Sequence, residues 1–474
     1  MSDDRNTRAD KRSVIIQSLE EERSIDDLTV KGRIPDWIDG SLFRNTPAKF
    51  EVGDRQLNHL FDGYAMLHLF TLRNGDVSYQ NKFLESDAYK HAREGEMKYK
   101  EFGTDPCRDI FEQFFTYFKP PDPTDNAVVN VAEIADEYLA LTETPIPVEF
   151  DPETLDTLEI KDGLGVDGHL TTAHPHFDSE RGATISYITE FSFRHRYKYF
   201  QIDNETGERD VINSIPTDEP AYMHSFGMTE NYVVLAEFPL VLDPFDVAIG
   251  NDPIIKAFEW KPEKGTRFTI LDKDSGEVIA RPSTEEAFFS FHHVNAFEQN
   301  GRVNIDLVTY PDADIIHDFY LEDIRSEGYN PSSPELSRVS VDMNDESISR
   351  DVLLDEFIEL PRFNYGSYGG EDYNYVYGVG QTSDSFLGKL IKVNVNDGST
   401  RTWSEDDVYP GEPVFLESPD ATAEDDGVIL SVIIDAEQEH SFLLVLDAST
   451  FEEIGRAVVP HVIPLGFHGQ FFEL

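Results

Sequence analysis

The stretch Lys389-Leu-Ile-Lys-Val-Asn-Val-Asn-Asp-Gly-Ser-Thr-Arg-Thr-Trp403 (KLIKVNVNDGSTRTW) alternates apolar and polar residues around an Asn-Asp-Gly turn. Alternation with a period of two is typical of β-strands, and Asn, Asp and Gly tolerate the backbone angles of a tight turn. The stretch therefore predicts a β-hairpin.

Hairpins of this kind recur along the chain. Successive copies are 52 to 77 residues apart when their turn residues are aligned. That spacing leaves room for about four strands in each unit, which is the size of a β-propeller blade. The sequence therefore predicts an all-β fold, a seven-bladed β-propeller, although the repeat alone leaves a β-sandwich or two smaller β domains open. The copies cover residues 67–83, 147–160, 197–212, 267–280, 338–352, 389–403 and 442–458.

The predicted propeller occupies nearly the whole chain. No stretch with the composition of a linker interrupts the copies, so residues 29–474 are expected to form a single domain. Residues 1–28 lack a core pattern, and we expect them to form a polar N-terminal tail that is partly disordered.

One segment departs from the strand pattern. Phe111, Phe114, Phe115 and Phe118 recur at helical spacing and would give a short helix an aromatic face. Such a face either packs on the body of the domain or is exposed, where it would contact a membrane or an apolar substrate. The second interpretation predicts peripheral membrane contact and substrate access at these four residues.

The chain is strongly acidic. It carries 92 Asp and Glu against 39 Lys and Arg, a formal net charge of −53. This charge argues against nucleic acid as a partner and makes an anionic membrane surface unfavourable. Because the acidic residues are spread along the whole chain, they indicate a solvated surface that stays soluble in concentrated salt, as in a halophilic proteome. A cation-buffering role is the alternative.

The expected compartment is the cytoplasm. Cys107 is the one cysteine in the sequence, so no intrachain disulfide can form and a reducing environment is indicated. The first residues are polar and charged, and no run approaches the ~20 apolar residues of a membrane helix. We therefore expect a soluble cytoplasmic protein, with contact at the inner face of the cell membrane if the aromatic segment is exposed.

Four histidines could form a metal site. A propeller brings the inner ends of its blades together at one axis, so ligands can come from residues far apart in sequence. Four histidines in apolar or small-residue contexts are separated by 50, 68 and 176 residues, in step with the blade spacing. Each alone is more simply explained as a buried or loop residue, but together they could bind Fe(II) or another first-row divalent metal with positions left open for a small ligand. They are His174, His224, His292 and His468.

Imidazole ligands also need an acceptor for the second ring nitrogen. Glu143, Glu359 and Glu412 lie in apolar or Pro-flanked runs, so we expect buried carboxylates there to provide it. The adjacent pair His292 and His293 leaves a question open. Neighbouring strand residues face opposite sides of a sheet, so only one of the two can reach the axis, and periodicity does not say which.

These motifs resemble those of the carotenoid cleavage oxygenases. The matching stretches run in the family's order from about residue 32 to the C-terminus, and residues 105–144 resemble the animal branch, with its β-carotene oxygenases and retinoid isomerohydrolase. The stretches are GRIPDWIDGSLFRNTP, HLFDGYAMLH, AHPHFD, HSFGMT, FHHVNAFE, EDDGVILSV and the C-terminal FHG.

The resemblance implies a metal site on the propeller axis. It implies non-haem Fe(II) held by the four histidines named above, with the three glutamates behind them and a dome of loops and short helices over an apolar tunnel. In the family the ligand precedes an Asn by three residues, which is His292 here, before Asn295. One stretch departs from the family, because Arg44-Asn-Thr-Pro-Ala48 replaces both glycines of the usual Arg-Asn-Gly-Pro-Gly, so the local turn is expected to differ.

The resemblance also implies an activity. It indicates a carotenoid cleavage dioxygenase that uses Fe(II) and O2 to cleave a conjugated double bond of a carotenoid or apocarotenoid. Similarity to the animal branch favours central cleavage of β-carotene to retinal. Eccentric apocarotenoid cleavage and retinyl-ester isomerohydrolysis, which needs no O2, are alternatives within the fold. A catalytically silent carotenoid-binding propeller and a scaffold for protein partners are the non-enzymatic alternatives.

Overall fold

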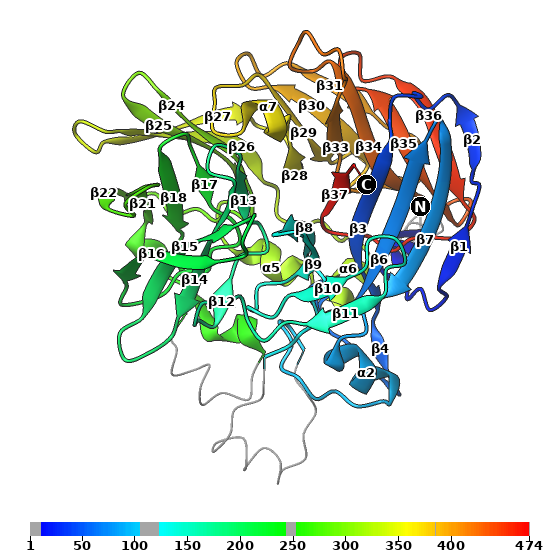
Figure 1. Cartoon of the computed structure of the whole chain (residues 1–474), viewed down its shortest axis with the longest axis horizontal. Helices are drawn as coiled ribbons and strands as arrows, with labels where there is room; N and C mark the ends of the chain where they lie inside the picture. Colours follow the sequence, from blue (N-terminus) through cyan, green and yellow to red (C-terminus); the bar gives the residue numbers. More distant parts are fainter. Residues whose placement is uncertain (1–10, 105–122, 243–252, 384, 474) are drawn as a thin grey trace.

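Seven antiparallel sheets surround a common axis in the part of the chain that the structure describes, and they form the blades of a β-propeller (Figure 1). The structure is a computed structural model, and it describes residues 11–104, 123–242, 253–383 and 385–473. The predicted all-β, seven-bladed fold is confirmed.

The predicted hairpins form antiparallel strand pairs in all seven blades, and in the second to sixth blades they are the outermost pair. The stretch quoted first becomes β30 (Lys389–Asn394) and β31 (Thr400–Trp403), and its turn contains Gly398 at a φ of +69°, a conformation that favours glycine. The other six copies likewise become antiparallel pairs. Sequence periodicity therefore located one strand pair in every blade, but it did not locate β1 and β2, which form the outer edges of the first and seventh blades.

The blades follow one another along the chain, each running from an inner strand to an outer strand. The first contains β3 (Gly40–Lys49), β6 (Tyr64–Arg73) and β7 (Asp76–Phe83). The second contains β8 (Asn130–Ile134), β9 (Glu137–Leu141), β10 (Val148–Phe150) and β11 (Thr157–Ile160). The third contains β12 (Leu170–Thr171), β13 (His176–Asp178), β14 (Ala183–Glu190), β15 (Arg196–Asp203) and β16 (Arg209–Pro216). The fourth contains β17 (Gly227–Met228), β18 (Tyr232–Glu237), β21 (Thr266–Asp272), β22 (Val278–Ala280) and β23 (Ser283–Thr284).

The last three blades complete the ring. The fifth contains β24 (His293–Gln299), β25 (Arg302–Thr309), β26 (Glu335–Asp342) and β27 (Ile348–Leu354). The sixth adds β28 (Ile358–Arg362) and β29 (Tyr375–Gly380) to β30 and β31. The seventh contains β32 (Val408–Pro410), β33 (Val414–Glu417), β34 (Gly427–Asp435), β35 (His440–Asp447) and β36 (Glu453–Val459).

The two ends of the chain close the ring by exchanging strands. Near the C-terminus, β37 (Gly469–Phe472) pairs with β3 at the inner edge of the first blade. Near the N-terminus, β2 (Thr29–Gly32) pairs with β36 at the outer edge of the seventh blade. Because each end is hydrogen-bonded into the blade formed by the other, the first and last blades are joined through their backbones.

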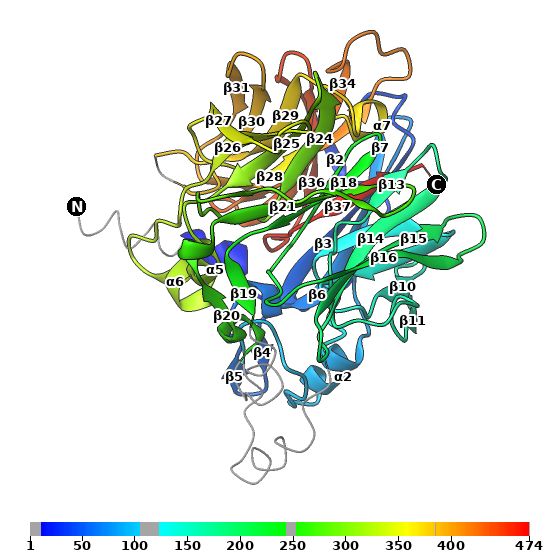
Figure 2. The ribbon, with the colours of Figure 1, turned by 90° about the vertical axis from the view of Figure 1, so that its left-hand side faces the viewer.

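Short elements lie outside the blades. Two small sheets pair β4 (Glu51–Val52) with β5 (Arg55–Gln56) and β19 (Leu240–Leu242) with β20 (Phe258–Trp260). In the part of the chain that the structure describes, the α-helices are α2 (Asp87–Arg93), α5 (Asp314–Asp318), α6 (Leu321–Arg325) and α7 (Tyr365–Tyr368). The 3-10 helices there are η1 (Val14–Ile16), η2 (Leu60–Asp62), η3 (Ile254–Ala257) and η4 (Pro262–Lys264). Helices α5 and α6 lie on one face of the ring (Figure 2). The expected dome stays a prediction, because residues 105–122 lie outside the described residues.

No helix in the described residues is both long enough and apolar enough to cross a membrane.

The N-terminal segment begins to pack on the propeller before residue 29. Ile15 and Ile16 are 0% and 1% exposed, and the carbonyl of Ile15 accepts a 2.8 Å hydrogen bond from the Leu465 backbone N–H. Strand β1 (Arg23–Ile25) pairs with β7. The described part of the expected tail is therefore tied to the first blade and to the core, which the charged residues around it concealed in the sequence.

Replacing Ile16 by alanine is expected to lower the free energy of unfolding by about 2–5 kcal/mol, since it removes a fully buried side chain and leaves a cavity. The control is Leu158→Ala, because Leu158 is 57% exposed and its loss should change the same quantity by less than about 0.5 kcal/mol. Chemical denaturation measures both. Equal, small effects would show that residues 14–16 do not pack on the core in solution.

Buried His59 makes the stability of the fold depend on pH. Its Nε2–H donates to the carbonyl of Ile316 at 2.8 Å, and its Nδ1 accepts from the backbone N–H of Phe61 at 3.2 Å. The neutral ring is thus satisfied, whereas a second proton on Nδ1 would face another N–H. Burial lowers the pKa of His59 to about 4, from the ordinary value of about 6.5.

We expect His59 to stabilise the fold above pH 6.5 and to lose that contribution as pH falls towards 4, because the unfolded chain binds the proton first. Over this range the free energy of unfolding of the wild type should fall by up to about 3 kcal/mol more than that of His59→Gln. Nearby Asp62, whose pKa burial raises to about 6, acts with the opposite sign, and the comparison cancels its contribution. Denaturation curves at half-unit pH steps provide the test, and parallel curves would contradict it.

Candidate metal centre

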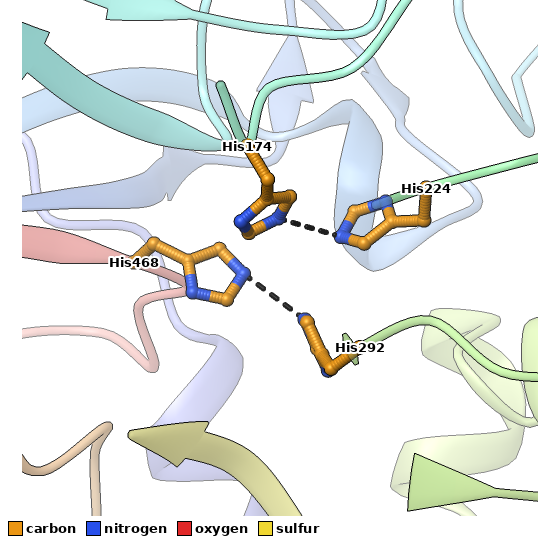
Figure 3. A group of neighbouring side chains, drawn as sticks. All are labelled: His174, His224, His292 and His468. Atoms are coloured by element: carbon orange, nitrogen blue, oxygen red, sulfur yellow. Dashed lines mark hydrogen bonds between the residues drawn. The ribbon is translucent and has the colours of Figure 1, made fainter. Parts of the chain in front are cut away.

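The four histidines singled out from the sequence meet at the axis of the propeller (Figure 3). His224, His292 and His468 lie three, one and one residues before the innermost strand of a blade, namely β17, β24 and β37, and His174 lies between β12 and β13. Inner strands begin near the axis, so these positions bring side chains from four blades to one point. One ring nitrogen from each lies within 4.8 Å of the others.

The imidazoles face one another through their Nε2 atoms. The Nε2 atoms of His174 and His224 are 3.0 Å apart, and those of His292 and His468 are 3.3 Å apart. His224, His292 and His468 are 4–8% exposed. Burial lowers the pKa of His174 well below its ordinary value and that of His468 to about 4, so these rings are neutral at pH 7.

A carboxylate lies behind three of the four imidazoles. The Nδ1 atoms of His224, His292 and His468 are 2.7, 2.6 and 2.8 Å from carboxylate oxygens. Carboxylates only accept hydrogen bonds, so these Nδ1 atoms carry the proton. Within the described residues, Nδ1 of His174 has no carboxylate partner. The carboxylates belong to Glu143, Glu359 and Glu412 respectively, the three glutamates picked out from the sequence.

Two tyrosines complete the surroundings of these carboxylates. Tyr222 donates its hydroxyl to Glu143 and Tyr310 donates to Glu359, both at 2.7 Å. Burial raises the pKa of Glu359, but attraction to His292 and the hydrogen bonds from His292 and Tyr310 outweigh it, and the net pKa is lowered. Of these two tyrosines, only Tyr222 could have been found from the sequence. It precedes His224 by two residues, and in an extended chain residues two apart point to the same side.

Glu412 lies in a cationic pocket. Arg44 donates to its Oε2 at 2.5 Å, Arg362 is 3.5 Å from its Oε1, and the backbone N–H of Gly469 donates at 3.0 Å. Burial opposes ionisation of Glu412, but Arg362, His468 and Arg44 together lower its pKa below the ordinary range. The carboxylate is therefore charged and can only accept from His468.

The departure at Arg44-Asn-Thr-Pro-Ala48 lies in a strand, and the expectation of an altered turn was wrong. The five residues belong to β3, and they are buried. Thr46, which stands where the family has glycine, has its hydroxyl 2.6 Å from Nε2 of His68. Arg44 connects this strand to Glu412, so the stretch supports the histidine cluster.

The donor set fits a metal ion. With their Nδ1 protons bound to carboxylates, Nε2 of His292 and Nε2 of His468 both present lone pairs, and no proton is available between them. Nitrogen atoms bound to one ion at ~2.1 Å and at right angles lie about 3 Å apart, close to the two separations observed. Neutral imidazoles suit first-row divalent metals, so the cluster can hold such an ion.

His293 points away from the cluster, so His292 is the one at the axis, which strand periodicity had left open and the family motif had implied. Its Nδ1 is 2.8 Å from the hydroxyl of Ser225. His176, the neighbour of His174, is also directed elsewhere, with Nε2 2.9 Å from the carbonyl of Phe226. In the pair His292 and His293, the residue at the propeller axis is therefore His292. In the pair His174 and His176, it is His174.

A largely apolar cavity opens beside the histidines. The volume available to the centre of a water molecule is about 130 Å³. His224, His292 and His468 line it together with aromatic and aliphatic side chains, among them Phe61, Phe102, Phe291, Phe319, Phe386 and Phe467. The predicted membrane-contact residues Phe111, Phe114, Phe115 and Phe118 lie outside the described residues.

Known proteins are similar to this chain in sequence along nearly its whole length. The family profile described as retinal pigment epithelial membrane protein (RPE65) matches residues 16–473. The chain is 37% identical to the mitochondrial carotenoid-cleaving dioxygenase of Macaca fascicularis, over 94% of this chain and 91% of that one. It is 35% identical to the β,β-carotene 15,15'-dioxygenase of Gallus gallus, over 93% of this chain and 94% of that one.

Solved structures agree with these relatives. A mutant of the Synechocystis apocarotenoid oxygenase superposes with a TM-score of 0.88 and 26% identity, over 98% of this chain and 99% of that one. A cobalt-substituted form of the same oxygenase superposes with a TM-score of 0.86. Since the profile covers almost the entire chain and the relatives match it nearly end to end, this chain belongs to the RPE65 family of carotenoid cleavage oxygenases.

Proposed function

We propose that the protein is a non-haem Fe(II) dioxygenase that cleaves a conjugated double bond of a carotenoid or apocarotenoid, with central cleavage of β-carotene to retinal as the favoured reaction. Both atoms of O2 enter the products, so that R–CH=CH–R' and O2 give R–CHO and R'–CHO. The observation that carries the proposal is the cluster of four imidazoles, three of which line an apolar cavity.

The relatives support the choice of substrate. The proteins that match nearly the whole chain are named carotenoid-cleaving and β,β-carotene dioxygenases. A cavity lined by phenylalanines can hold an extended polyene, which offers few polar groups for recognition.

The histidine cluster supports the choice of metal. Bound Fe(II) would supply the electrons that let O2 react with a closed-shell polyene. His174, His224, His292 and His468 would hold it and remain neutral, which keeps the centre cationic. The carboxylates of Glu143, Glu359 and Glu412 fix three of the rings through Nδ1, so the rings cannot rotate away. The apolar wall excludes water from the reacting bond.

The test is product identification with iron-loaded protein. Incubation with β-carotene and with apocarotenals under ¹⁸O2, followed by mass spectrometry, should give aldehydes that carry ¹⁸O, and retinal from β-carotene. The protein without iron is the control. Absence of aldehyde from every substrate would overturn the proposal, and conversion of a retinyl ester without O2 consumption would support the isomerohydrolase alternative.

A further inference from the structure

A third glutamate lines the cavity beside Glu143 and Glu359, and no hydrogen bond joins it to the histidines. Glu101 lines the cavity and is 4% exposed. Its Oε1 accepts one hydrogen bond, from the hydroxyl of Thr124 at 3.2 Å. Among the described residues, its other oxygen has no partner.

Two carboxylates near Glu101 accept more hydrogen bonds than Glu101 does. Asp62 accepts from the backbone N–H of Gly103 and from the hydroxyl of Thr104, and Asp125 accepts from two backbone N–H groups at the start of α2. Both are at most 4% exposed. Glu143 and Glu359 also line the cavity, but each accepts from the Nδ1–H of a histidine in the cluster. Among the described glutamates that line the cavity, Glu101 is therefore the one that is not bound to the histidine cluster.

The surroundings of Glu101 favour its neutral acid form. Burial raises its pKa well above the ordinary value, and the nearby Asp62 and Asp125 act in the same direction. A protonated carboxyl has one O–H donor and one carbonyl acceptor, whereas a carboxylate could only accept. A hydroxyl can bind to both atoms of the acid, and an aldehyde oxygen can bind to its O–H.

A row of aromatic rings leads from Glu101 to the histidine cluster. Phe102, the next residue, has its ring 5.3 Å from that of Phe61. The ring of Phe61 is in turn 6.1 Å from that of Phe291, which precedes His292, and 5.1 Å from that of Phe467, which precedes His468. All four rings line the cavity. A polyene with its end at Glu101 would therefore extend along these rings towards the imidazoles.

We propose that Glu101 binds a hydroxyl or carbonyl oxygen on the substrate, so that an oxygenated polyene binds more tightly than the hydrocarbon β-carotene, although β-carotene remains a substrate. The proposal rests on the proposed function, since it takes the cavity to be the polyene site. A hydrocarbon leaves the second oxygen of the buried acid without a partner among the described residues, whereas an oxygenated end group can bind it. Sites with buried polar groups discriminate against ligands that cannot pair with them.

The first test is kinetic. It compares β-carotene with its derivative that bears one ring hydroxyl, in the wild type, Glu101→Met and Glu101→Gln. Methionine keeps an unbranched chain but removes both oxygens, and it should lower the ratio of kcat/KM for the hydroxylated over the hydrocarbon substrate by about tenfold or more. Glutamine retains a donor and an acceptor and should stay within about threefold of the wild-type ratio. Asp125→Asn removes a neighbouring acid that does not line the cavity and should keep the wild-type ratio.

The second test detects the hydrogen bond itself and needs no turnover. In the absence of O2, the infrared C=O stretch of a bound apocarotenal should lie at lower frequency than in hydrocarbon solvent, and Glu101→Met should abolish this shift. An unshifted band in the wild type, or an equal substrate ratio in wild type and Glu101→Met, would overturn the role of Glu101. Failure of all substrates to be cleaved, with the shifted band present, would reject the dioxygenase function and leave the role of Glu101 standing.

Discussion

Replacing His292 by alanine is expected to remove the bound iron and to lower turnover at least about a thousandfold, a loss of about 4 kcal/mol of barrier stabilisation. His292 supplies one of four converging nitrogens, and its Nδ1 is fixed by Glu359 at 2.6 Å, so no neighbouring side chain can take its place. Metal analysis of the purified variant and product assays measure the two effects.

The adjacent residue provides the control. His293 differs from His292 by one position but points towards Ser225, so His293→Gln should retain iron even if the fold is somewhat less stable. Circular dichroism would verify that both variants are folded. Iron retained by His292→Ala, or lost from folded His293→Gln, would reject the assignment of the axial histidine.

Replacing Arg44 by methionine is expected to lower the free energy of unfolding by about 3–5 kcal/mol. The side chains of Arg44 and Glu412 are 3% and 1% exposed, so the substitution leaves a carboxylate buried with its nearest cation removed. Because Glu412 also accepts from Nδ1 of His468, we expect metal affinity to fall by about 10–100-fold. Chemical denaturation and metal competition measure the two quantities.

An exposed ion pair supplies the comparison for Arg44. Arg33 and Asp36 are 3.2 Å apart with both side chains largely exposed, so Arg33→Met should change stability by no more than about 1 kcal/mol and leave metal affinity unaltered. Similar losses in the two variants would show that burial of the Arg44–Glu412 pair is not what makes it important.

Local sequence patterns were most informative where structure is local. The hairpins could be located because strand alternation and turn residues are properties of neighbouring positions, as in residues 389–403. The blade spacing then allowed four distant histidines to be considered together. Residues whose roles depend on distant partners gave no such signal. Arg44 reaches Glu412 across 368 positions, and Tyr310 reaches Glu359 across 49.

The N-terminal segment and Glu101 illustrate the same limit. Charged residues around Ile15 and Ile16 made the segment look like a tail, because burial is decided by what the rest of the fold places against it. Glu101 is one acidic residue among 92, and only the cavity distinguishes it. The acidic composition indicates a salt-adapted surface, which stays a prediction.

The sequence by itself determined the strand content, the repeat and the small set of histidines and glutamates from which a site could be built, because these follow from residue type and spacing. Strand periodicity could not choose between His292 and His293, and the family resemblance pointed to His292. Only the tertiary structure decided that His293 turns to Ser225, that three carboxylates bind the outer ring nitrogens, and that Glu101 lies in an apolar cavity with a single hydrogen-bond partner among the described residues. Closing the ring through β37 and β2 brings residues hundreds of positions apart within hydrogen-bonding distance, and no local pattern encodes such contacts.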